Sequence, residues 1–410
     1  MVTRRACTSA LAPVPLRDEA GCMVKLRRHH RVTAASNGDP EATAATSWML
    51  TERAPDSDVA PYVARIAGVG RRLPVTHLST EALMGTTRHH THIDLERLTG
   101  IHERRVSVGD EDSLTLAVGA ARDCLARSGR RAEDIDLVVS CSITKYRDGL
   151  VQWLEPTASQ AVARAIGAAN ATTFDLSNAC AGTLTGVLVA NNWVRRGASR
   201  RALVVSGEYI SQLGTNAARH VRSIVSRELA SLTLGDAGGA VLIEGAEHGE
   251  PGIGVAGFTT VADHSRLCLA YPARHEAGAR MFTKARAIHR VAIADTPVLL
   301  NEVLDAAGLR IDEIDHVIPH QTSARAIRTG MRVVTEALGA APRNPAVVTV
   351  DRYGNTASTT HVVALVEELD AGHLRPGDQV ALVALASGLE IGVVMFTVDE
   401  ELEACRGNSD

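Results

Sequence analysis

The sequence predicts an α/β protein built from two similar halves, and two observations carry this prediction. From about Tyr62 onward, short runs rich in Val, Ile and Leu alternate with amphipathic helical segments, which is typical of parallel or mixed sheets covered on both faces. The second is a repeat: residues 133–142 recur as 312–321, and 201–206 as 380–385, each 179 residues later. Equal offsets indicate a duplicated unit, so we expect two halves related by a pseudo-twofold axis.

The elements of the first half follow from local patterns. A strand and turn are expected directly after Tyr62. A helix is expected to begin at Cys180, because the apolar residues that follow it recur every three or four positions. That helical stripe contains Leu184, Val187, Leu188 and Trp193. The other predicted elements are helices at 121–129 and 159–168 and strands at 134–142, 172–177 and 201–208.

These patterns divide the chain into four regions. Residues 1–60 mix charge with Ser, Thr, Pro and Asp and show no sustained period, so we expect a poorly structured N-terminal extension. No apolar core follows its first arginines, which argues against a signal peptide. We expect one half at 61–248, the other at 249–400 and a tail at 401–410.

Composition excludes several classes of protein. The 410 residues are 45% hydrophobic with a net charge of −4, as in a soluble globular protein and unlike a nucleic-acid binder. No apolar run approaches the ~20 residues that a membrane span needs. The seven cysteines are scattered and form no CxxC pair, which argues against a disulfide framework and against a metal site. A reducing cytoplasm is therefore the expected location.

Cys180 is a candidate nucleophile. A cysteine at the start of a helix lies near unpaired backbone N–H groups and the positive end of the helix dipole, and both favour the thiolate. The small residues Ala179, Ala181 and Gly182 leave room for a substrate. The alternative is that Cys180 is a small buried hydrophobic residue, as most free cysteines are.

His320 and Asn355 occur in the second half of the chain. His320 comes at the end of an apolar strand, and Asn355 follows Gly354 just before a helix. Open α/β sheets place their sites at strand ends and loops of this kind. Taken separately, such a His is more often structural and such an Asn more often belongs to a turn.

Together, these residues lie in motifs that resemble those of the β-ketoacyl-acyl-carrier-protein synthase III branch of the thiolase superfamily. The resemblance extends over about residues 63–399 and implies a five-layered αβαβα thiolase fold and an obligate dimer. Its motifs are NACAG (178–182), PHQTS (319–323), YGNTAS (353–358), TGIHERR (99–105), LGDAGGAVLIE (234–244) and GDQVALVALASGLEIG (377–392).

The resemblance implies a role for each site residue. Cys180 attacks an acyl thioester and carries the acyl group, while the backbone N–H groups of Cys180 and Ser387 bind the oxyanion. His320 and Asn355 bind the carbonyl of a second acyl or malonyl thioester and stabilise its enolate for a Claisen condensation. The expected substrates are acyl-CoA or acyl-carrier-protein thioesters, with no other cofactor.

Two positions depart from the housekeeping members of that family. Glu155 stands 25 residues before Cys180, where those enzymes carry an apolar residue that enters the partner subunit. In this respect the chain resembles the head-to-head condensing enzymes of olefin and β-lactone pathways, in which a Glu at this position acts as a base in the active site of the partner subunit. The alternative is that Glu155 is an ordinary surface residue at the start of a helix. The usual Trp before TGI is absent, and Arg97 is a candidate for substrate binding.

Three functions remain open at this point. The first is an acyl-thioester condensing enzyme of specialised lipid or polyketide metabolism, acting as a homodimer. The second is an acyltransferase that passes the Cys180-bound acyl group to a hydroxyl or amine, with His320 as general base. The third is a partner subunit of a heterodimeric condensing enzyme, in which Glu155 and the surface around it serve an active partner.

Overall fold

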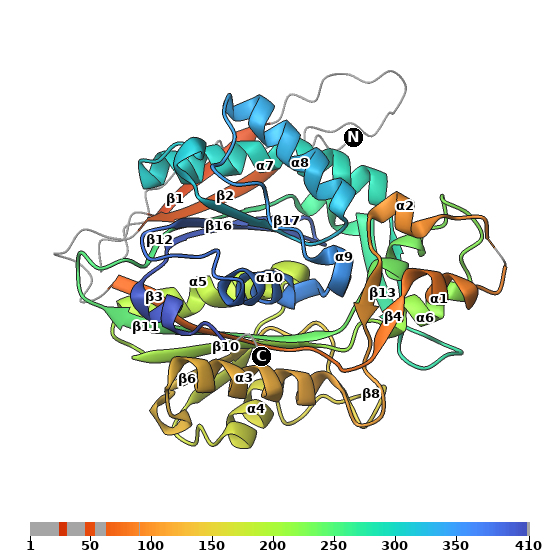
Figure 1. Cartoon of the computed structure of the whole chain (residues 1–410), viewed down its shortest axis with the longest axis horizontal. Helices are drawn as coiled ribbons and strands as arrows, with labels where there is room; N and C mark the ends of the chain where they lie inside the picture. The colour runs from red at the N-terminus through yellow and green to blue at the C-terminus, as the bar shows by residue number, and fades with distance from the viewer. Residues whose placement is uncertain (1–23, 31–45, 54–62, 90, 408–410) are drawn as a thin grey trace, which may run out of the picture.

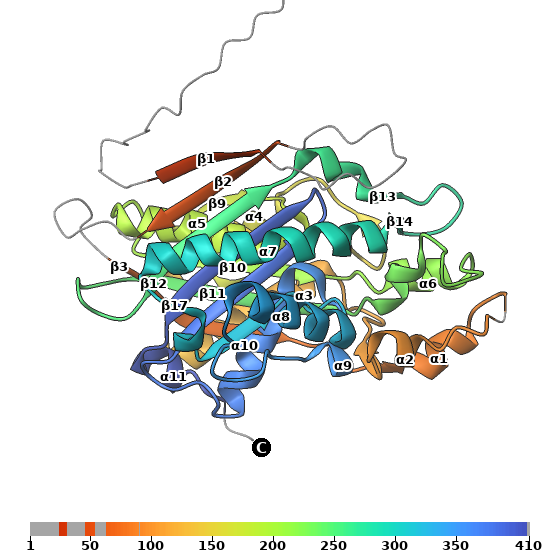
Figure 2. The ribbon, with the colours of Figure 1, turned by 90° about the horizontal axis from the view of Figure 1, so that it is seen from above.

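The computed structural model describes residues 24–30, 46–53, 63–89 and 91–407. Two sheets lie in parallel layers with a pair of helices between them and further helices on each outer side (Figures 1 and 2). This arrangement is the predicted five-layered αβαβα fold.

The first sheet has five strands in the order β3-β11-β10-β6-β9. The strands β10, β6 and β9 run parallel to one another, and β11 and β3 continue the sheet in antiparallel pairs. Their bounds are β3 Val63–Arg72, β11 Ala237–Ala246, β10 Arg201–Glu208, β6 Leu137–Ser140 and β9 Thr172–Asp175. β6 is buried at every position, as expected for a central strand covered on both faces.

The second sheet repeats this order as β12-β17-β16-β15. β15 and β16 are parallel, whereas β16, β17 and β12 are antiparallel neighbours, as in the first sheet. The bounds are β12 Ile253–Thr260, β17 Glu390–Thr397, β16 Gln379–Ala386 and β15 His316–Pro319. The predicted duplication is therefore confirmed in the strand order.

Helices form the other three layers. On the outer sides, α3 (Ser113–Ser128) and α4 (Ala158–Ile166) cover the first sheet, and α7 (Ala285–Ala307) and α8 (Ala324–Leu338) cover the second (Figure 1). Between the sheets lie α5 (Gly182–Arg195) and α10 (Thr360–Asp370). Both central helices begin next to candidate site residues.

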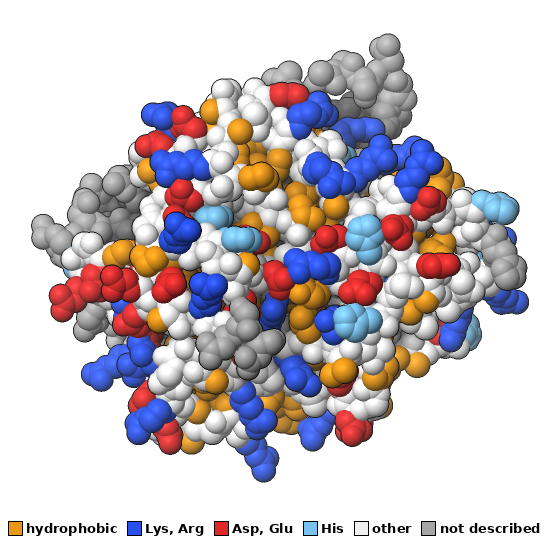
Figure 3. Space-filling model, viewed as in Figure 1, with side chains coloured by type: hydrophobic (Ala, Val, Ile, Leu, Met, Phe, Trp, Pro, Cys, Tyr) orange, Lys and Arg blue, Asp and Glu red, His pale blue; other side chains and the backbone are white. Residues whose placement is uncertain are grey.

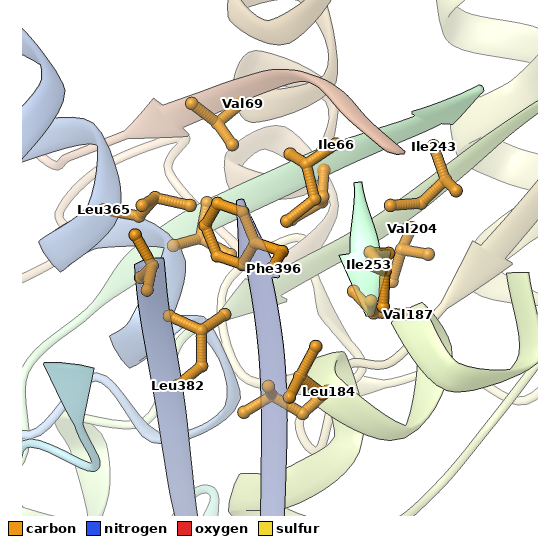
Figure 4. Packing of buried hydrophobic residues seen from close by; sticks show 14 of the residues in the cluster. Ile66, Val69, Leu184, Val187, Val204, Ile243, Ile253, Leu365, Leu382 and Phe396 are labelled. Carbon is orange, nitrogen blue, oxygen red and sulfur yellow. The ribbon is translucent and has the colours of Figure 1, made fainter. Parts of the chain in front are cut away.

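The largest apolar cluster spans both halves. Leu184 and Val187 of α5 pack between residues of the two sheets, including Val204 of β10 and Phe396 of β17 (Figure 4). Each fully buried side chain of this size stabilises the fold by about 1.5–3 kcal/mol. Because one core is shared, we infer that the two halves fold as a single unit.

The prediction for residues 1–60 was wrong in part. β1 (Val24–His30) and β2 (Thr46–Arg53) pair with each other, and β2 pairs antiparallel with β12 at the edge of the second sheet. Strands at a sheet edge are held by main-chain hydrogen bonds that need no apolar alternation, so the sequence pattern did not reveal them. The rest of the predicted extension lies outside the described residues.

The predicted tail also contains structure. Helix α11 (Glu400–Ala404) begins at the boundary, and Leu402 and Cys405 are buried in the largest apolar cluster. Across the described part of the chain, no helix combines the length and apolar character needed to cross a membrane.

Candidate active site

Cys180 lies on a single 3₁₀ turn, η2 (Ala179–Ala181), that leads directly into α5. The sequence placed it at the start of this helix, and the structure agrees. Ala179 has a φ of 44°, in the left-handed region that an alanine rarely adopts. The chain therefore turns sharply just before the thiol, at the buried end of the central helix.

An apolar cluster adjoins the thiol. Cys180 packs against a buried cluster formed by Ile210, Leu213 and Leu234 of the first half and Ala357 of the second half. Burial raises the pKa of the Cys180 thiol to about 12, nearby charge on Cys268 and Glu208 adds to the rise, and its own backbone N–H opposes it. The resting group is a thiol, whose proton must leave before or during attack.

His320 directly follows β15. Its backbone N–H donates to the carbonyl of Val383 in β16 at 2.8 Å, and the same carbonyl accepts Nε2 of His361 at 3.0 Å. The two imidazole rings lie 5.9 Å apart. His320 is only 3% exposed, so burial, with a contribution from His361, lowers its pKa to about 3. His320 is therefore neutral at physiological pH.

Asn355 is fixed by three hydrogen bonds. Its backbone N–H donates to Thr233 at 2.8 Å, and its carbonyl accepts the N–H of Gly235 at 3.1 Å. Its side-chain oxygen accepts the N–H of Ala357 at 3.0 Å. With that oxygen occupied, the Asn355 amide offers its NH₂ group to a ligand. A Cβ at Gly235 would lie 2.1 Å from the Tyr353 carbonyl, so only glycine permits this close approach.

Gln321 connects the His320 and Asn355 segments. Its side-chain NH₂ donates to Pro319 and Val347, and its oxygen accepts the N–H groups of Thr349 and Val350. All four bonds are 2.8–3.1 Å long. Gln321 lies within PHQTS but had no predicted role, because three of its four partners are 26–29 residues away in sequence.

The structure brings Cys180, His320 and Asn355 to one place from both halves of the fold. The turn η2 packs against β16, which holds His320, and against η6 (Ala357–Thr359), which follows Asn355. The segments that carry the three predicted site residues thus come together from both halves of the fold.

Ser387 lies in the turn between β16 and β17, both of which contact η2. The predicted role of the Cys180 and Ser387 backbone N–H groups in binding an oxyanion stays a prediction.

Glu155 does not join this cluster. It is exposed, in the segment that follows β8 (Val151–Gln152), and its neighbours Val151 and Leu154 are 62% and 79% exposed. The structure thus places the exposed Glu155 carboxylate in a segment with exposed apolar side chains.

Arg97 is exposed on the short helix α2 (Leu95–Thr99), which packs against α8. Arg325 and Arg328 of α8 are also exposed, and Figure 3 shows Lys and Arg side chains gathered over α8. Because α8 starts just after His320, this basic surface adjoins the site.

Two buried acids that sequence analysis did not single out support the site. Asp236 accepts the N–H groups of Ile210 and Ser211 at 2.7 and 2.6 Å, so it helps to fix the apolar cluster beside Cys180. Glu208, at the end of β10, accepts hydrogen bonds from both halves. Across the described ranges, no three His, Cys, Asp or Glu side chains are grouped to hold a metal ion.

Known proteins share both sequence and fold with this chain. One family model, of 3-oxoacyl-[acyl-carrier-protein] synthase III, matches residues 174–263, and a second, of its C-terminal region, matches residues 304–398. The β-ketoacyl-[acyl-carrier-protein] synthase III 1 of Bacillus cereus is 30% identical over 332 residues, covering 80% of this chain and 97% of that protein.

Solved structures give the same result for the fold. The priming β-ketosynthase from the R1128 polyketide biosynthetic pathway superposes with a TM-score of 0.70 at 26% identity, covering 83% of this chain and 98% of its own. The cerulenin-bound OleA protein of Xanthomonas campestris gives a TM-score of 0.71 at 23% identity, covering 84% and 100%. The chain therefore belongs to the β-ketoacyl-acyl-carrier-protein synthase III family and is a condensing enzyme with the thiolase fold.

Proposed function

We propose that Cys180 takes an acyl group from a CoA or carrier-protein thioester and that this group is then joined to a second thioester. In the first step the Cys180 sulfur bonds to the acyl carbon, and the donor thiol leaves with a proton. In the second step an enolate of the other thioester attacks the acyl carbon, and the Cys180 thiolate leaves. The convergence of Cys180, His320 and Asn355 from two halves of the fold carries this proposal.

His320 and Asn355 suit enolate stabilisation. Each offers an N–H donor without a charge, and each is held from its own backbone. Fixed donors of this kind commonly contribute a factor of about 10²–10³ each to the rate. A His320 with a pKa lowered to about 3 is a weak base, which disfavours the alternative in which it activates a hydroxyl or amine acceptor.

The acyl chain would lie among Ile210, Leu213 and Leu234, which belong to the apolar cluster that Cys180 packs against. These side chains are aliphatic and carry no charge, so we propose that the group on Cys180 is an unsubstituted alkyl chain. Burial of each of its CH₂ groups contributes about 0.8 kcal/mol to binding.

The basic surface on α2 and α8 supports an acidic donor. Arg97, Arg325 and Arg328 are exposed there, beside the helix that follows His320. The phosphates of CoA or an acidic carrier protein would be attracted to this surface, and salt would weaken that attraction.

The surface around Glu155 supports a homodimer. Val151 and Leu154 expose apolar side chains beside Glu155, and β9 is an edge strand of the first sheet. Asp175 at the end of β9 accepts the N–H groups of Ala158 and Ser159, so the edge and the Glu155 segment lie close together. We propose that a second copy covers this surface and receives Glu155 as a base for the non-decarboxylating reaction.

Intact-mass measurement tests the function. The protein is offered a series of acyl-CoAs from acetyl-CoA to palmitoyl-CoA, and then malonyl-CoA or a second acyl-CoA. We expect one acyl adduct that is lost in Cys180→Ala, followed by a condensed product. CO₂ release distinguishes the decarboxylating reaction from the head-to-head reaction. A protein that forms no adduct with any donor would contradict the proposal.

A further inference from the structure

Glu208 is a fully buried acid that the proposed reaction does not use. One carboxylate oxygen accepts the backbone N–H of Ile143 at 2.8 Å. The other accepts the N–H and the hydroxyl of Thr144 at 3.1 and 3.0 Å. These neutral donors hold the carboxylate rigidly at the end of β10, near Cys180.

Glu208 is also bonded to the second half of the fold. The hydroxyl of Ser358 donates to the same oxygen that accepts Ile143, although the two residues are 150 positions apart. Ser206 of β10 lies beside them, with its Oγ 2.6 Å from that of Ser358. All three side chains are buried, so this contact joins the two halves directly behind the site.

Ser358 belongs to the same tight turn that orients Asn355. Its neighbour Ala357 has a φ of 53°, a left-handed conformation that is unfavourable for an alanine because its Cβ crowds the backbone. The N–H of Ala357 is the group that occupies the side-chain oxygen of Asn355. A turn that is strained at Ala357 needs an anchor, and Ser358 supplies one through Glu208.

We propose that Glu208 is a positioning residue for the condensation step. Through Ser358 it holds η6 in the conformation that keeps the Asn355 NH₂ group available beside Cys180. This inference rests on the proposed function, because it concerns the second thioester that Asn355 would bind. It assigns Glu208 no contact with substrate.

The hydrogen bonds explain why a carboxylate occupies this position. Ile143 and Thr144 each direct a backbone N–H at a different oxygen of Glu208, so both oxygens must accept. A glutamine would set its NH₂ group against one of these donors. A buried N–H left unpaired in this way is unfavourable, and the side chain would shift away from Ser358.

The test separates the two half-reactions in Ser358→Ala, Glu208→Gln and the double variant. Loading of Cys180 is followed by intact mass, with the acyl-CoA that loads the wild type best in the acetyl to palmitoyl series. Condensation is followed with malonyl-CoA and with a second molecule of the same acyl-CoA. We expect Ser358→Ala to load within about threefold of the wild-type rate but to condense about tenfold more slowly.

The double variant examines the connection itself. If Glu208 acts on condensation through Ser358, the double variant condenses about as slowly as the slower single variant, because the second change removes nothing further. A double variant whose loss of condensation rate equals the product of the two single-variant losses would contradict this connection.

Glu244→Gln is the matched control. Glu244 is a buried acid at the far end of β11, where it pairs with Arg130 and Arg201. We expect it to lower the melting temperature while loading and condensation stay in the wild-type ratio. Wild-type condensation by Ser358→Ala, or loading and condensation that fall together, would overturn the inference. A wild type without an acyl adduct would instead overturn the proposed function.

Discussion

The side-chain oxygen of Asn355 accepts the backbone N–H of Ala357 at 3.0 Å, which leaves the amide NH₂ free to donate. We expect Asn355→Asp to keep this bond and lose the donor, so condensation should fall by about 10²–10³-fold. Loading of Cys180 should continue, since Asn355 has no part in that step. Intact mass and product analysis measure the two steps separately, and equal losses in both would contradict the assigned role.

The two buried histidines should make the folded protein less stable as the pH is lowered. The pKa values of His320 and His361 are lowered to about 3 and about 4, both mainly by burial, whereas an unfolded histidine has a pKa of 6.5. Between these values only the unfolded chain binds the proton, so stability is complete above pH 6.5 and falls as the pH decreases toward 4.

His361→Val should remove one of these protons. We therefore expect its stability to depend less on pH than that of the wild type between pH 6.5 and 4.5, measured by urea unfolding at a series of pH values. His373, which is exposed beside Glu368, offers a matched control in His373→Val. Parallel pH curves for the wild type and His361→Val would exclude the buried neutral state.

Thiol reactivity tests the environment of Cys180. Because the pKa of the thiol is raised to about 12, mainly by burial, the reactive thiolate is scarce at neutral pH. We expect the rate of alkylation by iodoacetamide to increase about tenfold for each pH unit from pH 7 to pH 10. Cys180→Ala provides the background from the other cysteines. A rate that levels off near pH 7 would show that the thiol is already ionised there.

Local sequence patterns predicted much of the fold. The periodic stripe after Cys180 corresponds to α5, and the apolar run at 201–208 is β10, whose observed bounds are the same. The repeat at an offset of 179 residues corresponds to the matching strand orders of the two sheets. These features depend on neighbours in sequence, or on a duplication that leaves similar strings, so they could be recognised.

Long-range contacts could not be recognised in this way. Glu208 meets Ser358 across 150 residues, and Gln321 meets Thr349 across 28. Polar side chains carry no periodic signal, so their partners emerge only once the fold is known. The surroundings of Glu155 could not be predicted either, since a single chain does not show what covers an exposed segment.

Glu155→Gln tests the proposed base. Gln has nearly the same size but cannot accept a proton, so we expect head-to-head condensation to be lost while Cys180 still loads. Glu133→Gln, an exposed substitution beside β6, is the control. Measuring product with two acyl-CoAs, and separately with malonyl-CoA, shows which reaction needs the carboxylate. Undiminished product from Glu155→Gln with two acyl-CoAs would remove Glu155 from the reaction.

Glu367 links the two halves at the surface and should contribute to stability. Burial alone would raise its pKa, but hydrogen bonds from Arg71 of β3 and from Tyr353 and Arg352 outweigh this and lower the pKa to about 2. Its contribution is therefore present above about pH 4.5, the ordinary value, and is lost as the pH falls toward 2.

We expect Glu367→Gln to lower the free energy of unfolding at pH 7 by about 1–3 kcal/mol, because it leaves partly buried donors without a charged acceptor. Glu336→Gln on α8 removes an exposed pair with Arg332, and such pairs contribute only about 0–1 kcal/mol. Urea unfolding at pH 7 and pH 4 compares the two variants. The difference between Glu367→Gln and the wild type should become smaller at pH 4, whereas an equal difference at both pH values would show that the carboxylate charge has no part in it.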